Sequence, residues 1–274
     1  MRISKEKSVE LFRNYMVLTG VSSLGFDEPE EAFLQNKKLG IVNGSSWVTL
    51  WSTYFGNQIL PGVKLINIGN EAQQLNFMKA HAEGRECPPA ENIVKTCQYA
   101  KDLCEMCKPD AILLTCSTMN RAYPYVQEAI SAYDVPLVQI DAPMMEKAVQ
   151  IGTDILIIAT HGPSVNSTRA LLEETAERQS AGKEIRYFGE TVETAFDLLG
   201  KGDIAGHNRT IEAVIRRAQK ERAIDCVVLA QLSMSIFYTE YPDPEAEFGI
   251  PVLCSGIEGF QRIKDIFRQQ SVDG

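Results

Sequence analysis

The sequence is short of basic residues: Lys and Arg number 27 against 36 Asp and Glu, which gives a formal net charge of −9. Nucleic-acid phosphates bind surfaces rich in Lys and Arg, so this balance argues against DNA or RNA as a partner. Long apolar runs are also lacking. No stretch approaches the roughly 18 apolar residues of a membrane span, and the N-terminus is charged rather than apolar. We therefore expect a cytoplasmic protein that binds neither nucleic acid nor a membrane.

The sequence signatures of cofactor and metal sites are lacking as well. Neither a P-loop nor a GxGxxG pattern is present, so no nucleotide cofactor is expected. One CxxC occurs, at Cys104 and Cys107, but no second pair completes a zinc site, and both thiols fall on one face of a helix expected over 90–107. Of three histidines, His81 and His207 lie in polar helical surroundings and are expected on the surface. We expect neither a cofactor nor a metal.

Seven cysteines are an odd number, and in a reducing compartment they are expected to be free thiols. Cys226 and Cys254 lie within apolar runs, which predicts that they belong to the core. Cys116 instead follows the apolar run 111–115 and opens a polar segment. Cys116 is therefore the thiol that we expect to do chemistry.

Apolar runs alternate with helical patterns along the chain, which is typical of parallel sheets connected by helices. The pattern occurs twice, because Cys116 and Gln231 follow corresponding apolar runs 115 positions apart. Pro136 and Pro251, each at the start of another apolar run, are separated by the same interval. A repeat that aligns single residues indicates a duplication. The chain length then fits two similar lobes better than one large domain.

We predict an α/β fold made of two pseudo-symmetric lobes, each a mostly parallel open sheet flanked by helices. Residues 1–36 are expected to form an N-terminal helical extension, residues 37–140 the first lobe and residues 141–255 the second. A C-terminal helix over 256–274 could return to the first lobe.

Ligands of open α/β sheets bind beyond the carboxyl ends of the strands, where loops meet helix N-termini. If the two lobes face one another, four such loops surround a cleft. These loops are rich in hydroxyl groups and poor in Lys and Arg, which suits a carboxylate or an enolate. The same hydroxyls could instead cap the helices that follow them. The candidate substrate-binding residues are Asn43, Ser45, Ser117, Thr118, Thr160, Gln231 and Ser233, and the candidate catalytic residues are Cys116 and His161.

Four short segments, taken in their order and spacing, resemble a known family. They are Thr115–Thr118, Val138–Pro143, Ala159–Gly162 and Leu229–Gln231. Over about residues 37–270 the chain resembles the aspartate/glutamate/hydantoin racemase superfamily, which includes maleate isomerases and arylmalonate decarboxylases. The resemblance implies two pseudo-symmetric lobes and cofactor-independent proton transfer at a carbon next to a carboxylate or carbonyl. The implied substrate is a small carboxylate or a cyclic imide.

The resemblance also implies roles for single residues. In two-base members a cysteine from each lobe faces the substrate, and Cys116 matches the first of them. The second position is Gln231, whose side chain cannot transfer a proton. We therefore expect a racemase or isomerase that uses Cys116 as acid and base, with His161 or a water transferring the proton on the second face of the substrate. Two alternatives stay open: a decarboxylase with Cys116 as sole proton donor, and a non-catalytic small-molecule binding protein. A homo-oligomer is compatible with each of these readings.

Overall fold

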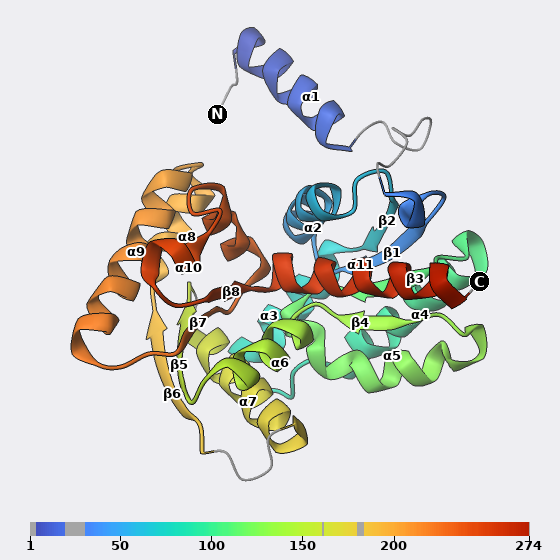
Figure 1. Cartoon of the computed structure of the whole chain (residues 1–274). Helices are drawn as coiled ribbons and strands as arrows, with labels where there is room; N and C mark the ends of the chain where they lie inside the picture. The colour runs from blue at the N-terminus through green and yellow to red at the C-terminus, as the bar shows by residue number, and fades with distance from the viewer. Residues whose placement is uncertain (1–3, 20–30, 161, 180–183, 274) are drawn as a thin grey trace. The chain divides into compact units, whose positions relative to one another are not determined.

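The computed structural model describes residues 4–19, 31–160, 162–179 and 184–273, and it divides the chain into two compact units (Figure 1). The first unit comprises the chain up to Val138 together with the C-terminal segment from Phe260. The second unit runs from Gln139 to Gly259.

Each unit contains a four-stranded sheet. The first has the order β2-β1-β3-β4 and the second the order β6-β5-β7-β8. Strand pairs β1·β2, β1·β3, β5·β6, β5·β7 and β7·β8 are all parallel. The strands are β1 (Lys38–Asn43), β2 (Lys64–Gly69), β3 (Ala111–Leu114), β4 (Leu137–Gln139), β5 (Asp154–Ala159), β6 (Arg186–Thr191), β7 (Cys226–Leu229) and β8 (Val252–Cys254). The predicted α/β class with parallel sheets is confirmed.

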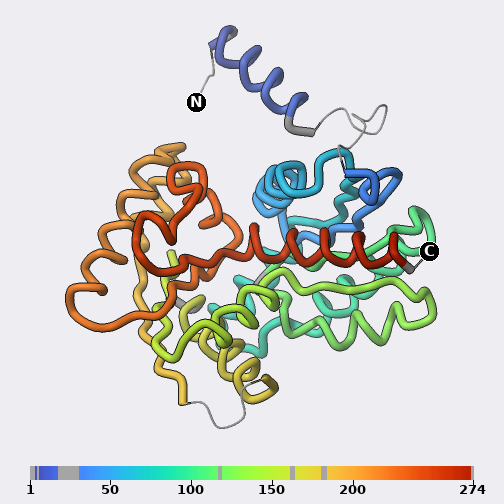
Figure 2. Tube along the Cα trace, viewed as in Figure 1, coloured from blue at the N-terminus to red at the C-terminus, as the bar shows by residue number. Residues whose placement is uncertain are grey.

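Helices connect the strands, and the alternation can be followed along the trace in Figure 2. The α-helices are α1 (Lys5–Thr19), α2 (Ser46–Ile59), α3 (Glu71–Ala82), α4 (Ala90–Cys107), α5 (Tyr123–Ala129), α6 (Ala142–Ile151), α7 (Gly162–Gln179), α8 (Glu193–Gly200), α9 (Ile204–Glu221), α10 (Pro244–Phe248) and α11 (Ser255–Asp273). Short 3-10 helices are η1 (Ala32–Leu34), η2 (Ser117–Ala122), η3 (Ser131–Tyr133) and η4 (Leu232–Thr239).

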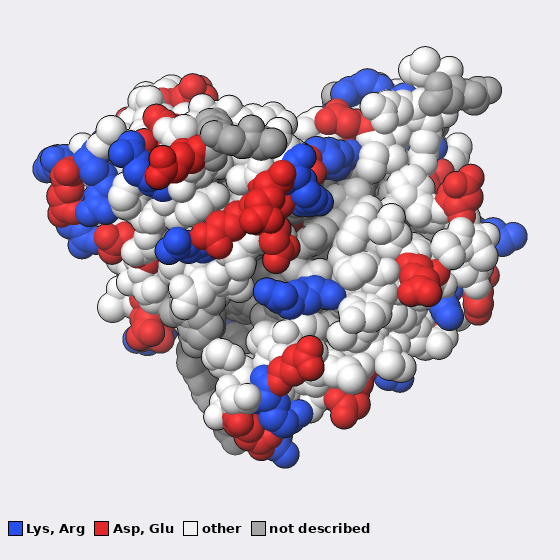
Figure 3. Space-filling model, turned by 90° about the horizontal axis from the view of Figure 1, so that it is seen from below, with Lys and Arg blue, Asp and Glu red and all other residues white. Residues whose placement is uncertain are grey.

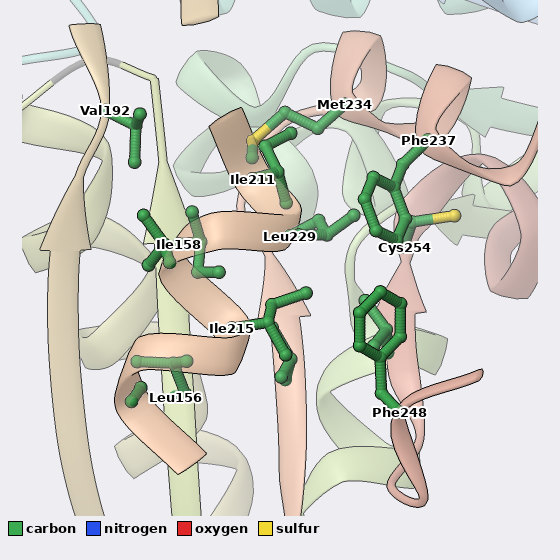
Figure 4. Close-up of a cluster of buried hydrophobic side chains, with 14 of the residues drawn as sticks. Leu156, Ile158, Val192, Ile211, Ile215, Leu229, Met234, Phe237, Phe248 and Cys254 are labelled. Carbon is green, nitrogen blue, oxygen red and sulfur yellow. The ribbon is translucent and has the colours of Figure 1, made fainter. Parts of the chain in front are cut away.

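The central strands are apolar because helices cover both of their faces. Every residue of β3, β5 and β7 is buried. Figure 4 shows the cluster in the second unit where Ile211 and Ile215 of α9 pack on Leu229 of β7, beside the aromatic rings of Phe237 and Phe248. Each fully buried aliphatic side chain contributes about 1.5–3 kcal/mol. In the second unit burial of this kind holds helices against both faces of the sheet, in two hydrophobic clusters.

The duplication extends to single hydrogen bonds. In the first unit the hydroxyl of Tyr123 donates to the backbone carbonyl of Leu137, at 3.2 Å. In the second unit the hydroxyl of Tyr238 donates to the carbonyl of Val252, at 2.5 Å. Each tyrosine thus ties the segment that follows one strand to the start of the next. Both pairs keep the 115-residue interval of the repeat.

His207 differs from the sequence expectation, because it is fully buried rather than on the surface. It lies on the face of α9 that also buries Ile211 and Ile215, and its polar sequence neighbours hid that periodicity. Its Nδ1 lies 2.8 Å from Asn208 Oδ1. Burial lowers the pKa of His207, and the hydrogen bond to Asn208 opposes this in part. His81 is exposed, as expected.

Acidification is expected to destabilise the protein through His207. Because burial holds its folded pKa below the ordinary value of about 6.5, the unfolded chain binds the proton more readily, and stability falls as the pH drops below that value. Thermal unfolding of the wild type and His207→Gln, followed from neutral pH downwards, measures this. The variant should lose less stability than the wild type. Equal losses would show that another group controls the acid response.

Charged side chains of both signs are interspersed on the face shown in Figure 3. That distribution agrees with the excess of acidic residues in the sequence and offers no broad basic surface on this face. Within the described segments, none of the helices has the length and apolar character needed to cross a bilayer.

Candidate active site

Cys116 lies at the carboxyl end of the sheet in the first unit, two residues after β3. It occupies the N-cap position of η2, in an extended conformation with φ −97° and ψ 108°, and its carbonyl accepts a hydrogen bond from Met119 N at 2.8 Å. Cys116 is 7% exposed and belongs to the hydrophobic cluster of the first unit, with Val42, Leu114 and Met119. Ser117 and Thr118 open η2, and their side chains lie outside the described part of the chain.

The turn after β1 approaches the thiol closely. An ideal Cβ built on Gly44 would lie 2.7 Å from Cys116 Sγ and 3.5 Å from Gln74 Oε1. No real Cβ fits at the first distance, so Gly44 is what allows the backbone to pass beside the thiol. Neither Gly44 nor Gln74 could be predicted as a neighbour of the thiol, because a lone glycine in a turn has no specific sequence pattern.

Gly44→Ala is expected to push the Cys116 thiol from its position. A misplaced catalytic group costs about 10-fold to 100-fold in rate, so we expect turnover to fall by about that factor while the unfolding temperature changes little. Gly200→Ala is a matched control, since a Cβ there meets nothing within 4 Å. Wild-type turnover in Gly44→Ala would mean that the thiol position beside Gly44 is unimportant.

Asn43, a predicted substrate-binding residue, holds the strand ends together. Its Oδ1 accepts from Thr115 Oγ1 at 2.5 Å and from Ser52 Oγ at 3.1 Å. Its Nδ2 donates to Asn67 Oδ1 at 2.8 Å. Asn43 ends β1, and its partners come from three other elements. Asn67 lies in β2, Thr115 follows β3 and Ser52 lies in α2. One buried amide therefore links three strands and a helix. This network fixes the backbone that carries Gly44 and Cys116.

Ser45 caps the helix that follows, as the alternative interpretation of its hydroxyl allowed. It is the N-cap of α2, and its side chain accepts from Val48 N at 3.4 Å. The next residue, Ser46, donates from its hydroxyl to Glu71 Oε1 at 2.7 Å. The hydrogen bonds from the Ser46 hydroxyl and backbone N–H lower the pKa of the Glu71 carboxyl. The starts of α2 and α3 are thereby joined beside the Gly44 turn.

In the second unit the positions corresponding to Ser45 and Cys116 are occupied by Thr160 and Gln231. Gln231 Oε1 accepts from Thr160 N at 2.7 Å and from Thr160 Oγ1 at 3.0 Å. An N–H can only donate, so the carboxamide oxygen faces Thr160 and its Nε2 faces the other way. Gln231 is the N-cap residue of η4, in which Ser233 is buried. His161 lies outside the described residues.

A small cavity of about 10 Å³, the room of about one water molecule, lies against Cys116 within the first unit. Besides Gly44 and Cys116 it is lined by Gln73 of α3, Thr96 of α4 and Met119 of η2. Sequence reasoning missed Gln73 and Thr96. A polar residue within a helical pattern gives no signal of which strand end its helix faces.

The other thiols do not share this setting. Cys226 and Cys254 are fully buried, as predicted from their apolar runs, and burial raises the pKa of the Cys254 thiol to about 12. Cys104 is buried on α4, and desolvation raises its pKa as well. Among the described residues, no group of three His, Cys, Asp or Glu side chains could hold a metal ion. Cys116 is the cysteine that lines the cavity described above.

Comparison with solved structures finds the same fold in several proteins. An aspartate racemase homologue from Pyrococcus horikoshii OT3 superposes with a TM-score of 0.62 at 17% identity, over 85% of this chain and 99% of that one. Allantoin racemase from Klebsiella pneumoniae gives a TM-score of 0.61 at 16% identity, over 86% and 89%. A glycine-to-cysteine mutant of arylmalonate decarboxylase gives 0.54 at 13% identity, over 84% and 93%.

The sequence itself was compared with curated proteins and with family models. None of the curated proteins matches it. The family model for Asp/Glu/hydantoin racemase matches residues 70–262, which is well over half of the chain and includes Cys116, Thr160 and Gln231. The resemblance recognised in the four short segments is thereby confirmed: the chain belongs to the Asp/Glu/hydantoin racemase family.

Proposed function

We propose that this protein is an enzyme that transfers a proton at a carbon next to a carboxylate or carbonyl, without a cofactor, using Cys116 as acid and base. The observation that carries the proposal is the setting of the thiol. Cys116 lies at the carboxyl end of β3, beside Gly44 and against a small cavity, within the segment that matches the racemase family model. The substrate class is a small carboxylate or a cyclic imide.

A thiol suits this chemistry because its ordinary pKa of about 8.5 lies close to neutral pH. General acid–base catalysis works best with a group whose pKa is near the working pH, and such a group contributes about 10²-fold to 10⁴-fold in rate. The thiolate removes the proton from the α-carbon, and the electron pair of the C–H bond moves toward the adjacent carbonyl as an enolate. The thiol then returns a proton to the carbon.

Gln231 supports a one-thiol version of this reaction. A carboxamide cannot supply the second proton that a two-thiol racemase needs, and its oxygen already accepts two hydrogen bonds from Thr160. A donor Nε2 in that place suits a carboxylate or enolate oxygen instead. We propose that Gln231 and Ser233 bind substrate, and that water or His161 supplies the second proton where the configuration is inverted.

The glutamine at position 231, in place of a second cysteine, also favours a second candidate: a decarboxylase with Cys116 as its only proton donor. In that reaction the bond between the α-carbon and a carboxylate breaks and carbon dioxide leaves. The electron pair stays on the carbon as an enolate, which the Cys116 thiol then protonates. This reaction needs a proton on one face only, which one thiol can supply.

Two reaction products, the opposite enantiomer and carbon dioxide, distinguish racemisation from decarboxylation. The purified protein is incubated with L-aspartate, L-glutamate, allantoin, a 5-substituted hydantoin and 2-methyl-2-phenylmalonate, which represent the compound classes after which relatives are named. Chiral chromatography detects the opposite enantiomer, and headspace analysis detects carbon dioxide. The proposal predicts inversion without carbon dioxide, whereas the second candidate predicts carbon dioxide and one enantiomer of the monoacid. If neither product forms but one of the compounds binds tightly, the protein is a binding protein and not an enzyme for these compounds.

A further inference from the structure

Polar side chains of α3 and α4 form a hydrogen-bonded cluster beside the cavity at Cys116, which we call the polar wall: Gln73, Asn92 and Thr96. Gln73 Nε2 donates to Asn92 O at 3.1 Å and to Thr96 Oγ1 at 3.0 Å. In return Asn92 Nδ2 donates to the backbone carbonyl of Gln73, at 2.9 Å. The Thr96 hydroxyl uses its own proton on Asn92 O, at 2.8 Å. All three side chains are buried, so these contacts hold α3 and α4 in a fixed relation.

These contacts decide how the carboxamide of Gln73 is oriented. A backbone carbonyl can only accept, so the NH₂ end of Gln73 faces Asn92 and the carbonyl end faces away from α4. Gln73 and Cys116 line the same cavity, which has room for about one water molecule. Gln73, with its carboxamide oriented by these contacts, therefore borders the cavity in which the thiol lies.

The second unit supplies an internal comparison. Gln73 is the third residue of α3, and the third residue of α8 is Ala195. Thr96 and Ile211 are related by the 115-residue interval, as are Cys116 and Gln231. Ala195 and Ile211 belong to one hydrophobic cluster. The unit that carries the thiol thus has polar residues, Gln73 and Thr96, where the unit that carries Gln231 has apolar ones.

We propose that Gln73 is a positioning residue for Cys116, because its carboxamide oxygen holds one water molecule in the cavity beside Sγ. The water donates one hydrogen bond to Gln73 Oε1 and the other to the thiolate, which stabilises the charged form. It also exchanges protons with the thiol: the thiol gives its proton to the water and receives one of the water's protons, so the charge is unchanged. This proposal rests on the proposed function, and it lets the Cys116 thiol exchange its proton with the bound water between catalytic steps.

The thiolate can be measured without a substrate. Iodoacetamide alkylation of Cys116 is followed against pH by peptide mass spectrometry, in the wild type and in Gln73→Met, which keeps the shape but lacks the amide. Loss of one hydrogen bond to the thiolate should slow alkylation at pH 7 by about fivefold and move its midpoint to higher pH. Gln98→Met, on the exposed face of α4, should leave the profile unchanged.

Thr96→Val keeps Gln73 but removes the hydroxyl that orients it, and should move the midpoint in the same direction by less. It also decides the question if Gln73→Met fails to fold in a thermal unfolding assay. An unchanged alkylation profile in the folded variants overturns the role of Gln73. The proposed function fails separately if alkylation of Cys116 depends on Gln73 as expected, but the wild type neither converts any compound tested nor exchanges its α-proton.

Discussion

Replacing Cys116 with Ala is expected to lower kcat by about 10²-fold to 10⁴-fold on any compound that the wild type converts, because the variant lacks the group that moves the proton. Cys116 belongs to the hydrophobic cluster of the first unit and borders a small cavity, so loss of its sulfur should destabilise the protein by about 1 kcal/mol. Steady-state kinetics and thermal unfolding of the same preparation measure both.

The matched control for this variant is Cys107→Ala. Cys107 is a half-buried thiol at the end of α4 in the same unit, and it does not line the cavity. Its loss should leave kcat unchanged. Equal activity of Cys116→Ala and the wild type would remove Cys116 from the mechanism, and an equal loss in both variants would point to a general effect of thiol removal.

Asn43→Ala is expected to destabilise the protein by about 2–4 kcal/mol, through unpaired buried polar groups and a new cavity. The Thr115 and Ser52 hydroxyls have other acceptors, at Val42 O and Val48 O, but Asn67 Oδ1 loses the donor that it faces. Denaturant unfolding measures the change. Because Asn43 fixes the strand ends that carry Gly44 and Cys116, activity should fall with stability.

Two further variants calibrate this loss. Ser52→Ala removes one donor to Asn43 and should cost about 1 kcal/mol. Asn14→Ala changes an exposed asparagine of α1 and should cost almost nothing. If Asn43→Ala were as stable as Asn14→Ala, the amide would not be what holds the three strands together.

The fold could be predicted from local patterns because its strands are buried on both faces. Continuous apolar runs such as 111–114 and 226–229 became β3 and β7, and the 115-residue interval between Tyr123 and Tyr238 recurs as the same hydrogen bond in both units. The position of Cys116 at a strand end followed from the same runs. These features depend on the order of residues along the chain.

The missed features depend on contacts between distant segments. Gln73 and Thr96 look like ordinary helix residues until α3 packs on α4 and brings their side chains within 3.0 Å. The sequence also does not show that Asn67 and Thr115 lie beside Asn43, whose predicted role in substrate binding stays a prediction. His207 was expected on the surface because its neighbours are polar, although the phase of α9 buries it.

The most direct test of the proposed chemistry is exchange of the α-proton in deuterium oxide, followed by proton NMR for wild type and Cys116→Ser. Proton transfer at carbon by the thiol predicts that the wild type incorporates deuterium at the α-carbon of at least one small carboxylate or cyclic imide. Cys116→Ser, whose hydroxyl is a far weaker acid, should exchange it at least about 10²-fold more slowly. Equal exchange by the two proteins would contradict the assignment of Cys116 as acid and base.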